Sequence, residues 1–231
     1  MGGDFYYNDR KHAGIVLGEI ILEKNIESPV LLALPRGGVP VAKEVSHILQ
    51  LPFDVLVVRK IGAPFNPEYG IGAMSEDLNP LMQAGEFIPL EHLDDDVIDI
   101  IADEKKELLR RIKLFRGDRK LPDLKNRNVI LIDDGLATGI TAAAAARYLK
   151  LLGAKLIYLA VPVGPRHYHE LLSKYVNEII CPYKPSHFTA VGEWYKEFYQ
   201  LSDEQVISDL RSIFPDQHFG ELKNDERDTF L

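Results

Sequence analysis

Short apolar runs alternate with amphipathic stretches along the chain. Five mostly apolar runs predict strands buried on both faces, because a strand with one solvated face would alternate apolar and polar residues. These runs span residues 30–34, 53–58, 129–132, 155–161 and 178–181. Apolar residues recur at helical spacing in residues 12–25, 39–49, 94–115 and 140–152, and a last helix starts near residue 203. Strands that alternate with helices predict an α/β fold with a mainly parallel sheet flanked by helices.

The segment of residues 59–89 interrupts this alternation. It holds several Gly and Pro residues and little periodicity, so we expect a long loop with at most short strands. Loops of this length in compact domains are usually functional lids or disordered segments. We therefore expect residues 59–89 to form a mobile loop. The whole chain, residues 1–231, is expected to form a single domain with its core near residues 10–180.

Length, charge and cysteine content exclude several classes of protein. The 231 residues fit one domain, and 46% hydrophobic with 27% charged residues exclude disordered and fibrous chains. The formal net charge of −8 argues against a nucleic-acid partner. The single cysteine, Cys181, excludes a disulfide framework within the chain and fits a reducing cytosol. Residues 1–11 lack the apolar core of a secretory signal, and no apolar stretch approaches the ~20 residues of a membrane helix, so we expect a cytoplasmic protein without membrane contact.

The richest chemistry follows the apolar run of residues 129–132. This run ends in Asp133-Asp134, and a turn with Thr138, Gly139 and Thr141 then leads into a predicted helix. Backbone N–H groups of such a turn, together with the positive end of the helix, bind phosphate well. The two carboxylates would repel a phosphate and suit sugar hydroxyls instead. The pattern therefore predicts a sugar-phosphate site.

Two common nucleotide motifs are absent from the glycine-rich segments. A Walker A loop needs Gly-Lys-Ser/Thr, whereas Gly139 precedes Ile140. A dinucleotide fingerprint needs three spaced glycines after a strand, whereas the pair Gly70 and Gly72 is followed by Ser75. Neither class of nucleotide site is supported.

Residues 129–141 resemble the phosphoribosyl-pyrophosphate (PRPP) signature of type I phosphoribosyltransferases: an apolar strand, two acids, then a Thr-Gly-x-Thr turn. Residues 34–40 are similar to the pyrophosphate-binding loop of that family, and residues 57–62 are similar to the start of its mobile catalytic loop. Almost the whole chain resembles a bacterial subgroup known as predicted phosphoribosyltransferases. The resemblance implies the reaction more firmly than the acceptor.

The resemblance implies that PRPP binds with Mg²⁺ and that pyrophosphate leaves the anomeric carbon of the ribose. Asp133 and Asp134 would hold the ribose hydroxyls, near the positive charge that develops on the ring. The 5′-phosphate would be held by Gly135, Leu136, Ala137, Thr138, Gly139 and Thr141. Pyrophosphate would be bound by Arg36, Gly37 and Gly38, with Arg59 and Lys60 as further cations. The implied catalytic residues are Arg59, Lys60, Asp133 and Asp134, and no side chain is expected to bind Mg²⁺ directly.

The acceptor site implied by the resemblance is a hood, formed mainly by residues 181–200 with the N-terminal segment. Flat side chains stack on bases, so the aromatic residues of this region are the candidates for acceptor binding. They are Phe188, Trp194 and Tyr195, with Tyr183, His187 and Phe198 as further candidates. The family also implies a homodimer.

One position departs from a branch of the family. The 6-oxopurine enzymes carry an acid at the loop position of Ala137, where it handles a proton of the base, and Ala137 cannot do so. The sequence therefore predicts a PRPP-dependent transferase that acts on a nucleobase or a similar nitrogen acceptor other than hypoxanthine or guanine. The alternative is a non-catalytic regulatory protein that binds PRPP or a nucleotide. The pyrophosphate-side residues Arg36 and Arg59 favour the enzyme, because a binder of nucleotide monophosphates has little use for them.

Overall fold

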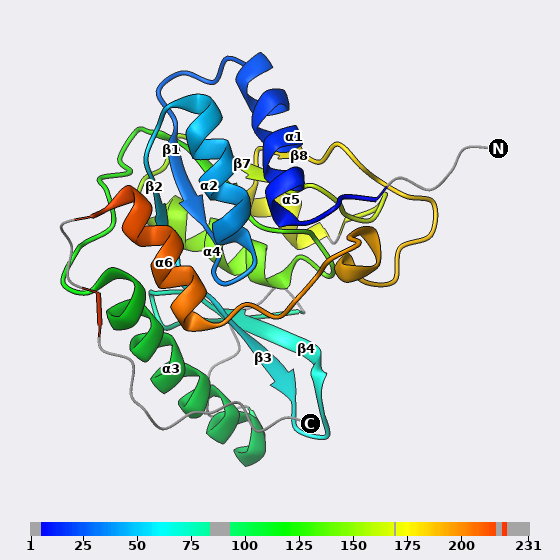
Figure 1. Cartoon of the computed structure of the whole chain (residues 1–231). Helices are drawn as coiled ribbons and strands as arrows, with labels where there is room; N and C mark the ends of the chain where they lie inside the picture. Colours follow the sequence, from blue (N-terminus) through cyan, green and yellow to red (C-terminus); the bar gives the residue numbers. More distant parts are fainter. Residues whose placement is uncertain (1–5, 84–92, 169, 216–218, 221–231) are drawn as a thin grey trace.

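A five-stranded parallel sheet forms the centre of the molecule. The computed structural model describes residues 6–83, 93–168, 170–215 and 219–220 (Figure 1). The sheet contains β1 (Val30–Ala33), β2 (Phe53–Val55), β6 (Asn128–Ile132), β7 (Leu156–Ala160) and β8 (Glu178–Ile180), in the order β2-β1-β6-β7-β8. Every neighbouring pair is parallel. The predicted fold class and all five predicted strands are confirmed, although β2 ends three residues before the expected boundary.

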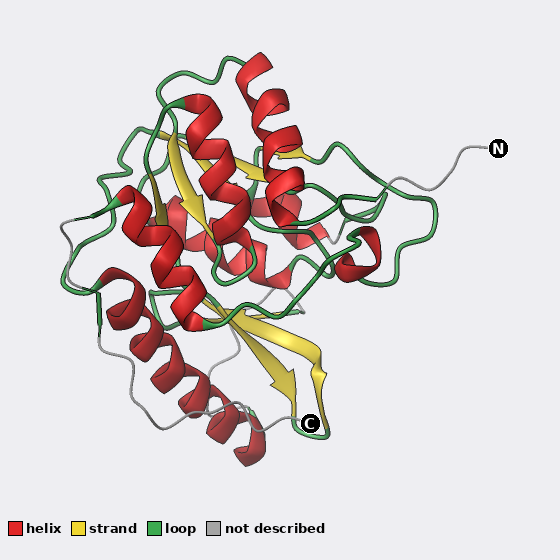
Figure 2. Ribbon diagram, viewed as in Figure 1, coloured by secondary structure: helices red, strands yellow, loops and turns green. Residues whose placement is uncertain are grey.

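Helices cover both faces of this sheet, as Figure 2 shows. The helices α1 (Arg10–Glu23) and α2 (Gly38–Leu49) lie on one face, and α4 (Ile140–Leu151) with α5 (Glu170–Tyr175) lies on the other. Successive side chains of β1 point to opposite faces, so Leu31 packs with the α1 and α2 side and Leu32 packs with the α4 side. Burial on both faces explains why these strands are continuous apolar runs.

A second, antiparallel sheet replaces the long loop that we expected over residues 59–89. It contains β3 (Arg59–Ala63), β4 (Asn66–Met74) and β5 (Pro80–Met82), and the nine-residue β4 contradicts the expectation of at most short strands. Close strand contacts explain the glycines that suggested a loop. A Cβ at Gly62 would lie 2.5 Å from the Pro67 carbonyl oxygen, and one at Gly72 would lie 2.9 Å from the Leu81 carbonyl oxygen. Residues 84–89 lie outside the described residues, and the mobility of this segment stays a prediction.

Two further helices complete the described fold, and one of them packs against the second sheet. The predicted long helix is α3 (Asp95–Arg116), which buries its apolar stripe and packs against β3. The last predicted helix is α6 (Asp203–Ile213), which contacts both α2 and α3 (Figure 1). A short 3₁₀-helix, η2 (Val191–Trp194), was not expected from the sequence, and neither was α5. In the described part of the chain, no helix combines the length and the apolar character needed to cross a membrane.

The start of α6 has a reciprocal cap that we expect to stabilise the protein. The Ser202 hydroxyl accepts a hydrogen bond from the Gln205 backbone N–H, and the Gln205 side chain accepts one from the Ser202 backbone N–H. Ser202→Ala is expected to lower the free energy of unfolding by about 1 kcal/mol, measured by urea denaturation. Ser208→Ala, at an exposed position in the same helix, is the control and is not expected to destabilise. Equal stabilities for the two variants would contradict the role of the cap.

Candidate active site

The site is located by the order of the strands. From β1 the chain continues to β2 on one side, whereas from β6 it continues to β7 and β8 on the other side. In open α/β sheets, ligands bind beyond the carboxyl ends of the strands at the point where the order reverses. The loops that follow β1 and β6 meet there, and the Leu34 backbone N–H donates a hydrogen bond to the Ile132 carbonyl oxygen at 2.8 Å. The topology thus brings Arg36 and Gly37 next to Asp133 and Asp134.

Glycine is required where these two loops touch. A Cβ at Gly37 would lie 2.0 Å from Oδ2 of Asp134, and one at Gly38 would lie 2.5 Å from the Ile132 carbonyl oxygen. Both distances are far below van der Waals contact, so a side chain at either position would push the loops apart. The peptide bond between Pro35 and Arg36, in the same loop, is cis. The pair Gly37-Gly38 therefore allows the backbone of one loop to lie against a carboxylate of the other.

The two adjacent carboxylates differ in their partners. Oδ1 of Asp133 accepts a hydrogen bond from the Asp134 backbone N–H at 2.9 Å, and Oδ2 of Asp134 forms an ion pair with Nε of Arg10 at 2.8 Å. Burial raises the pKa of Asp133 well above its ordinary value, and the charge of Asp134 raises it further. Burial also raises the pKa of Asp134, against the lowering effect of the Arg10 guanidinium. Two carboxylates in this setting stabilise a positive charge placed beside them.

Arg10 was not expected as a site residue from the sequence, yet it lines a cavity and pairs with Asp134. Besides its ion pair with Asp134, it donates a hydrogen bond from Nη1 to the Tyr199 carbonyl oxygen at 2.8 Å. Its guanidinium carbon lies 3.8 Å from the centre of the Phe198 ring. The Tyr195 hydroxyl donates to the Asp134 carbonyl oxygen at 2.5 Å. Arg10 therefore connects the carboxylates to residues 198–199 of the hood.

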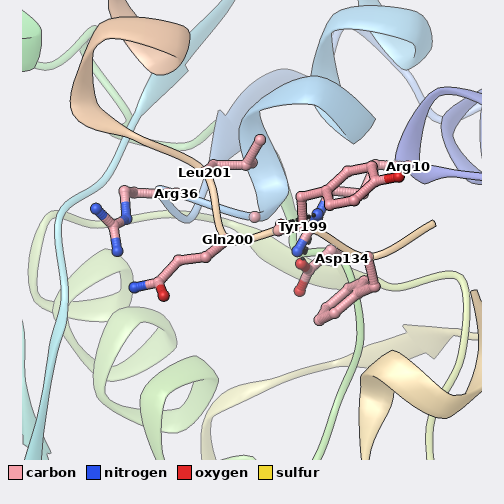
Figure 3. A pocket seen from close by; sticks show the side chains of 8 residues that line it. Arg10, Arg36, Asp134, Tyr199, Gln200 and Leu201 are labelled. Carbon is pink, nitrogen blue, oxygen red and sulfur yellow. Dashed lines mark hydrogen bonds and ion pairs between the residues drawn. The ribbon is translucent and has the colours of Figure 1, made fainter. Parts of the chain in front are cut away.

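A cavity of about 370 Å³ opens above these loops. Figure 3 shows Arg36 at one end of the cavity and Arg10 beside Asp134 at the other. Its lining consists of Arg10, Arg36, Gly37, Asp134, Phe198, Tyr199, Gln200 and Leu201. The loop that follows β6 and the loop that follows β1 therefore face one space, and residues 198–201 form most of its remaining wall.

The turn that follows Asp134 leads into an uncapped helix. Gly139 has a φ of +81° and precedes α4, which has no side-chain cap at its N-terminus among the described residues. The first backbone bond of the helix joins the Ala143 N–H to the Gly139 carbonyl oxygen, and within the described structure the N–H groups of residues 137–142 make no hydrogen bond, so they are available to an anion. Within the turn, Thr138 is exposed, whereas Leu136 is buried and its N–H donates to the Val163 carbonyl oxygen. Leu136 anchors the turn and does not offer this N–H to a phosphate.

The remaining residues of the turn differ in exposure. Ala137 is exposed and Thr141 is half-buried in the first turn of α4, so both can face a ligand. Gly135 is buried, and a Cβ there would lie 2.3 Å from Cγ1 of Val191. The hood therefore packs directly on the phosphate turn at Gly135.

The two expected cations of the catalytic loop lie at the start of β3. Nε of Arg59 donates a hydrogen bond to Oε2 of Glu104 at 2.5 Å. Lys60 is exposed, and its aliphatic stem lies across Gly70, where a Cβ would come within 3.1 Å of Cδ of Lys60. Neither residue belongs to the lining of the 370 Å³ cavity. Their catalytic role stays a prediction.

The aromatic residues of the hood mostly pack against one another. Trp194 and Tyr195 are 9% and 6% exposed and form a cluster with Tyr7, against which Phe188 and Tyr183 pack. Of the six expected acceptor residues, Phe198 is the one that lines the cavity, and His187 is exposed. The burial of Trp194 and Tyr195 favours a packing role over base stacking. Sequence reasoning could not separate the two roles, because both use aromatic residues.

The donor atoms suit a metal ion that arrives with its substrate. Among the described residues, no three His, Cys, Asp or Glu side chains gather as metal ligands. Mg²⁺ commonly takes one or two carboxylates and completes its coordination with substrate phosphates and water. Asp134, which lines the cavity, is already paired with Arg10, so a divalent ion here would take most of its ligands from a bound substrate and water.

Comparisons with known proteins agree with the geometry. The chain matches the family model of the phosphoribosyl transferase domain over residues 9–195. It is 41% identical over 207 residues to proteins from two Mycobacterium tuberculosis strains, CDC 1551 and H37Rv, which are provisionally named phosphoribosyl transferases. The match covers 88% of this chain and 46% of each relative, so the chain spans about half the length of these curated relatives.

Among solved structures, the chain is similar to the crystal structure of TT1426 from Thermus thermophilus. The TM-score is 0.73 at 36% identity, and the superposition covers 91% of this chain and 99% of that chain. The family match includes both loops that meet at the reversal of strand order. The chain belongs to the type I phosphoribosyltransferase family.

Proposed function

We propose that this chain transfers the 5-phosphoribosyl group of PRPP to a nucleobase or a similar nitrogen acceptor and releases pyrophosphate. Membership of the family identifies the chain as a phosphoribosyltransferase. The class of acceptor and the roles of the residues are what we propose in addition. The observation that carries it is the meeting of Asp134 with the Arg36-Gly37 loop in one cavity. Asp134 would bind the sugar in this cavity, and Arg36 would bind its leaving group.

The arrangement can stabilise a transition state with separated charges. As the bond between C1′ and the pyrophosphate oxygen breaks, the electron pair leaves with pyrophosphate and positive charge grows on the ribose ring. Asp133 and Asp134 would hold the ribose hydroxyls and stabilise that positive charge. The N–H groups at the start of α4 would hold the 5′-phosphate. Arg36 would bind the departing pyrophosphate, and the acceptor nitrogen would form the new bond to C1′.

This function would require Mg²⁺ as a cofactor. When bound with PRPP, Mg²⁺ supplies charge neutralisation to the pyrophosphate group. The chain itself would contribute binding and orientation: Asp134 would bind the sugar, and Arg36 at the other end of the cavity would bind the pyrophosphate. A homodimer and a cytoplasmic location stay predictions, and light scattering of the purified chain would measure the former.

The direct test incubates the protein with PRPP, Mg²⁺ and a panel of nucleobases and related amines, and follows the release of pyrophosphate. Release that depends on one acceptor would support the proposal and identify the substrate. Tight binding of PRPP without release in the presence of any acceptor would favour the regulatory alternative. No binding of PRPP, measured by calorimetry with Mg²⁺ present, would contradict both.

Removal of the Arg59 charge tests the pyrophosphate side. Arg59→Ala is expected to lower kcat/KM by about 10²–10³, the effect of losing one preorganised electrostatic donor. The initial rate of pyrophosphate release measures this loss. Arg127→Ala is the control, because Arg127 precedes β6 at the opposite edge of the sheet and is expected to leave the rate unchanged. Equal rates for the two variants would exclude Arg59 from the site.

A further inference from the structure

Arg36 and Arg59, the two arginines assigned to pyrophosphate, both meet carboxylates from outside the core sheet. Nε of Arg59 donates to Oε2 of Glu104, in the middle of α3. Nη1 of Arg36 lies 3.7 Å from Oδ1 of Asp203, the first residue of α6. Neither α3 nor α6 contributes a residue to the lining of the cavity. Two helices that do not line the cavity therefore hold the counter-charges of its pyrophosphate side.

Further ion pairs extend from the Asp203 contact into α3. Arg110 of α3 donates from Nη2 to Oδ2 of Asp203 at 2.8 Å and from Nε to Oε2 of Glu107 at 2.6 Å. Oε1 of Glu107 accepts a second bond, from Nε of Arg111, at 2.6 Å. Burial lowers the pKa of Arg111, and the charge of Arg59 lowers it further. Asp203 and Glu107 thus alternate with Arg36, Arg110 and Arg111 along one series of ion pairs, and Glu104 with Arg59 forms a separate pair.

The contacts leave most of the donors of Arg59 and Arg36 unused. Among the residues that the structure describes, Arg59 makes its hydrogen bond through Nε, and Arg36 makes an ion pair that is too long for a hydrogen bond. A guanidinium has five N–H donors, so a carboxylate behind it can fix its direction while the other donors bind a phosphate. Oδ1 of Asp203 is buried without a hydrogen-bond partner in the described structure, so its interaction with Arg36 is electrostatic.

We propose that Glu104 and Asp203 are positioning residues for the pyrophosphate side of the site. Glu104 orients Arg59, and Asp203 orients Arg36. This inference rests on the proposed function, and it adds α3 and α6 to the parts of the chain on which pyrophosphate binding depends. The two carboxylates act through the arginines and do not touch the substrate.

The test measures by calorimetry the Kd of two ligands for the protein. The ligands are pyrophosphate with Mg²⁺, and ribose 5-phosphate. Glu104→Ala is expected to raise the Kd for pyrophosphate about tenfold, as removal of an orienting residue does at other binding sites. The Kd for ribose 5-phosphate is expected to stay within about twofold, because that ligand binds at the carboxylate and phosphate loops. Glu104→Gln keeps an acceptor oxygen for Nε of Arg59, so we expect it to restore most of the affinity. Asp203→Ala is expected to behave like Glu104→Ala.

A matched control and a double-mutant cycle separate positioning from general effects. Asp103→Ala removes one negative charge from the same helix, and Asp103 pairs with the exposed Lys106, so we expect no change in either Kd. In an Arg59→Ala background, Glu104→Ala should have no further effect on the Kd for pyrophosphate, because the carboxylate acts through Arg59.

Three results would overturn the inference. Tighter pyrophosphate binding by both Glu104 variants would show that the carboxylate competes with the ligand for Arg59. An effect of Glu104→Ala equal to that of Asp103→Ala, or one that persists without Arg59, would also exclude positioning. In each case wild-type binding of pyrophosphate leaves the proposed function intact, whereas absence of PRPP and pyrophosphate binding by the wild type would overturn both.

Discussion

The double variant Asp133→Asn/Asp134→Asn is expected to lose at least about 10³ in kcat/KM for PRPP-dependent transfer. Asparagine has nearly the shape of aspartate, so the loops that meet at Gly37 can keep their geometry. The amides carry no negative charge, however, and cannot stabilise the positive charge that grows on the ribose ring. The expected loss exceeds that of removing one electrostatic donor, because both charges are removed together.

The fold of this double variant is expected to remain intact. Burial and mutual repulsion raise the pKa of Asp133, which means that the folded protein disfavours two negative charges at this position. Neutral side chains remove that repulsion but leave Arg10 without its charged partner, so the thermal midpoint of unfolding should fall by a few degrees at most while the transition stays cooperative. Asp123→Asn, in an exposed loop, is the control for the activity measurement. Unaltered turnover, or loss of activity only through unfolding, would contradict the assignment of the carboxylates.

The core sheet could be predicted from the sequence because of its burial. Strands such as β1 and β6 are covered by helices on both faces, and this makes them continuous apolar runs with clear ends. The second sheet could not be predicted in the same way. Its β4 contains Gly70 and Gly72, and at Gly72 the neighbouring strand approaches too closely for a side chain. Glycine in a strand and glycine in a loop give the same sequence signal.

The candidate site was predicted where its residues are contiguous and missed where they are distant. Asp133, Asp134 and the following turn form one segment, and Arg36 with Gly37 forms another, so motifs identify both. Arg10 is separated from Asp134 by 124 positions, and nothing around Arg10 distinguishes it from a surface residue at a helix start. Only the packing of α1 beside the sheet brings its guanidinium to the carboxylate.

A buried ion pair lies next to the connection that leads into the second sheet, and we expect its loss to destabilise the protein strongly. Nη1 and Nη2 of Arg116 donate to Oε1 and Oε2 of Glu76 at 2.8 and 2.6 Å, and these side chains are 7% and 4% exposed. Oε1 of Glu76 also accepts from the Val57 backbone N–H at 2.9 Å, and Arg116 donates to the Val55 carbonyl oxygen at 3.2 Å. The pair therefore fixes the position of the connection between β2 and β3. Val57 in this connection lies two residues before Arg59.

Glu76→Ala is expected to lower the free energy of unfolding by about 3–5 kcal/mol, because the Arg116 charge would stay buried without its partner. Urea denaturation measures this loss. Replacement of both residues, Glu76→Leu with Arg116→Met, should cost less than the single change, since no buried charge is then left. Asp103→Ala breaks an exposed pair on α3 and should change the stability by less than about 1 kcal/mol. A small loss for Glu76→Ala, or a larger loss for the double variant, would mean that backbone packing alone holds the connection between β2 and β3.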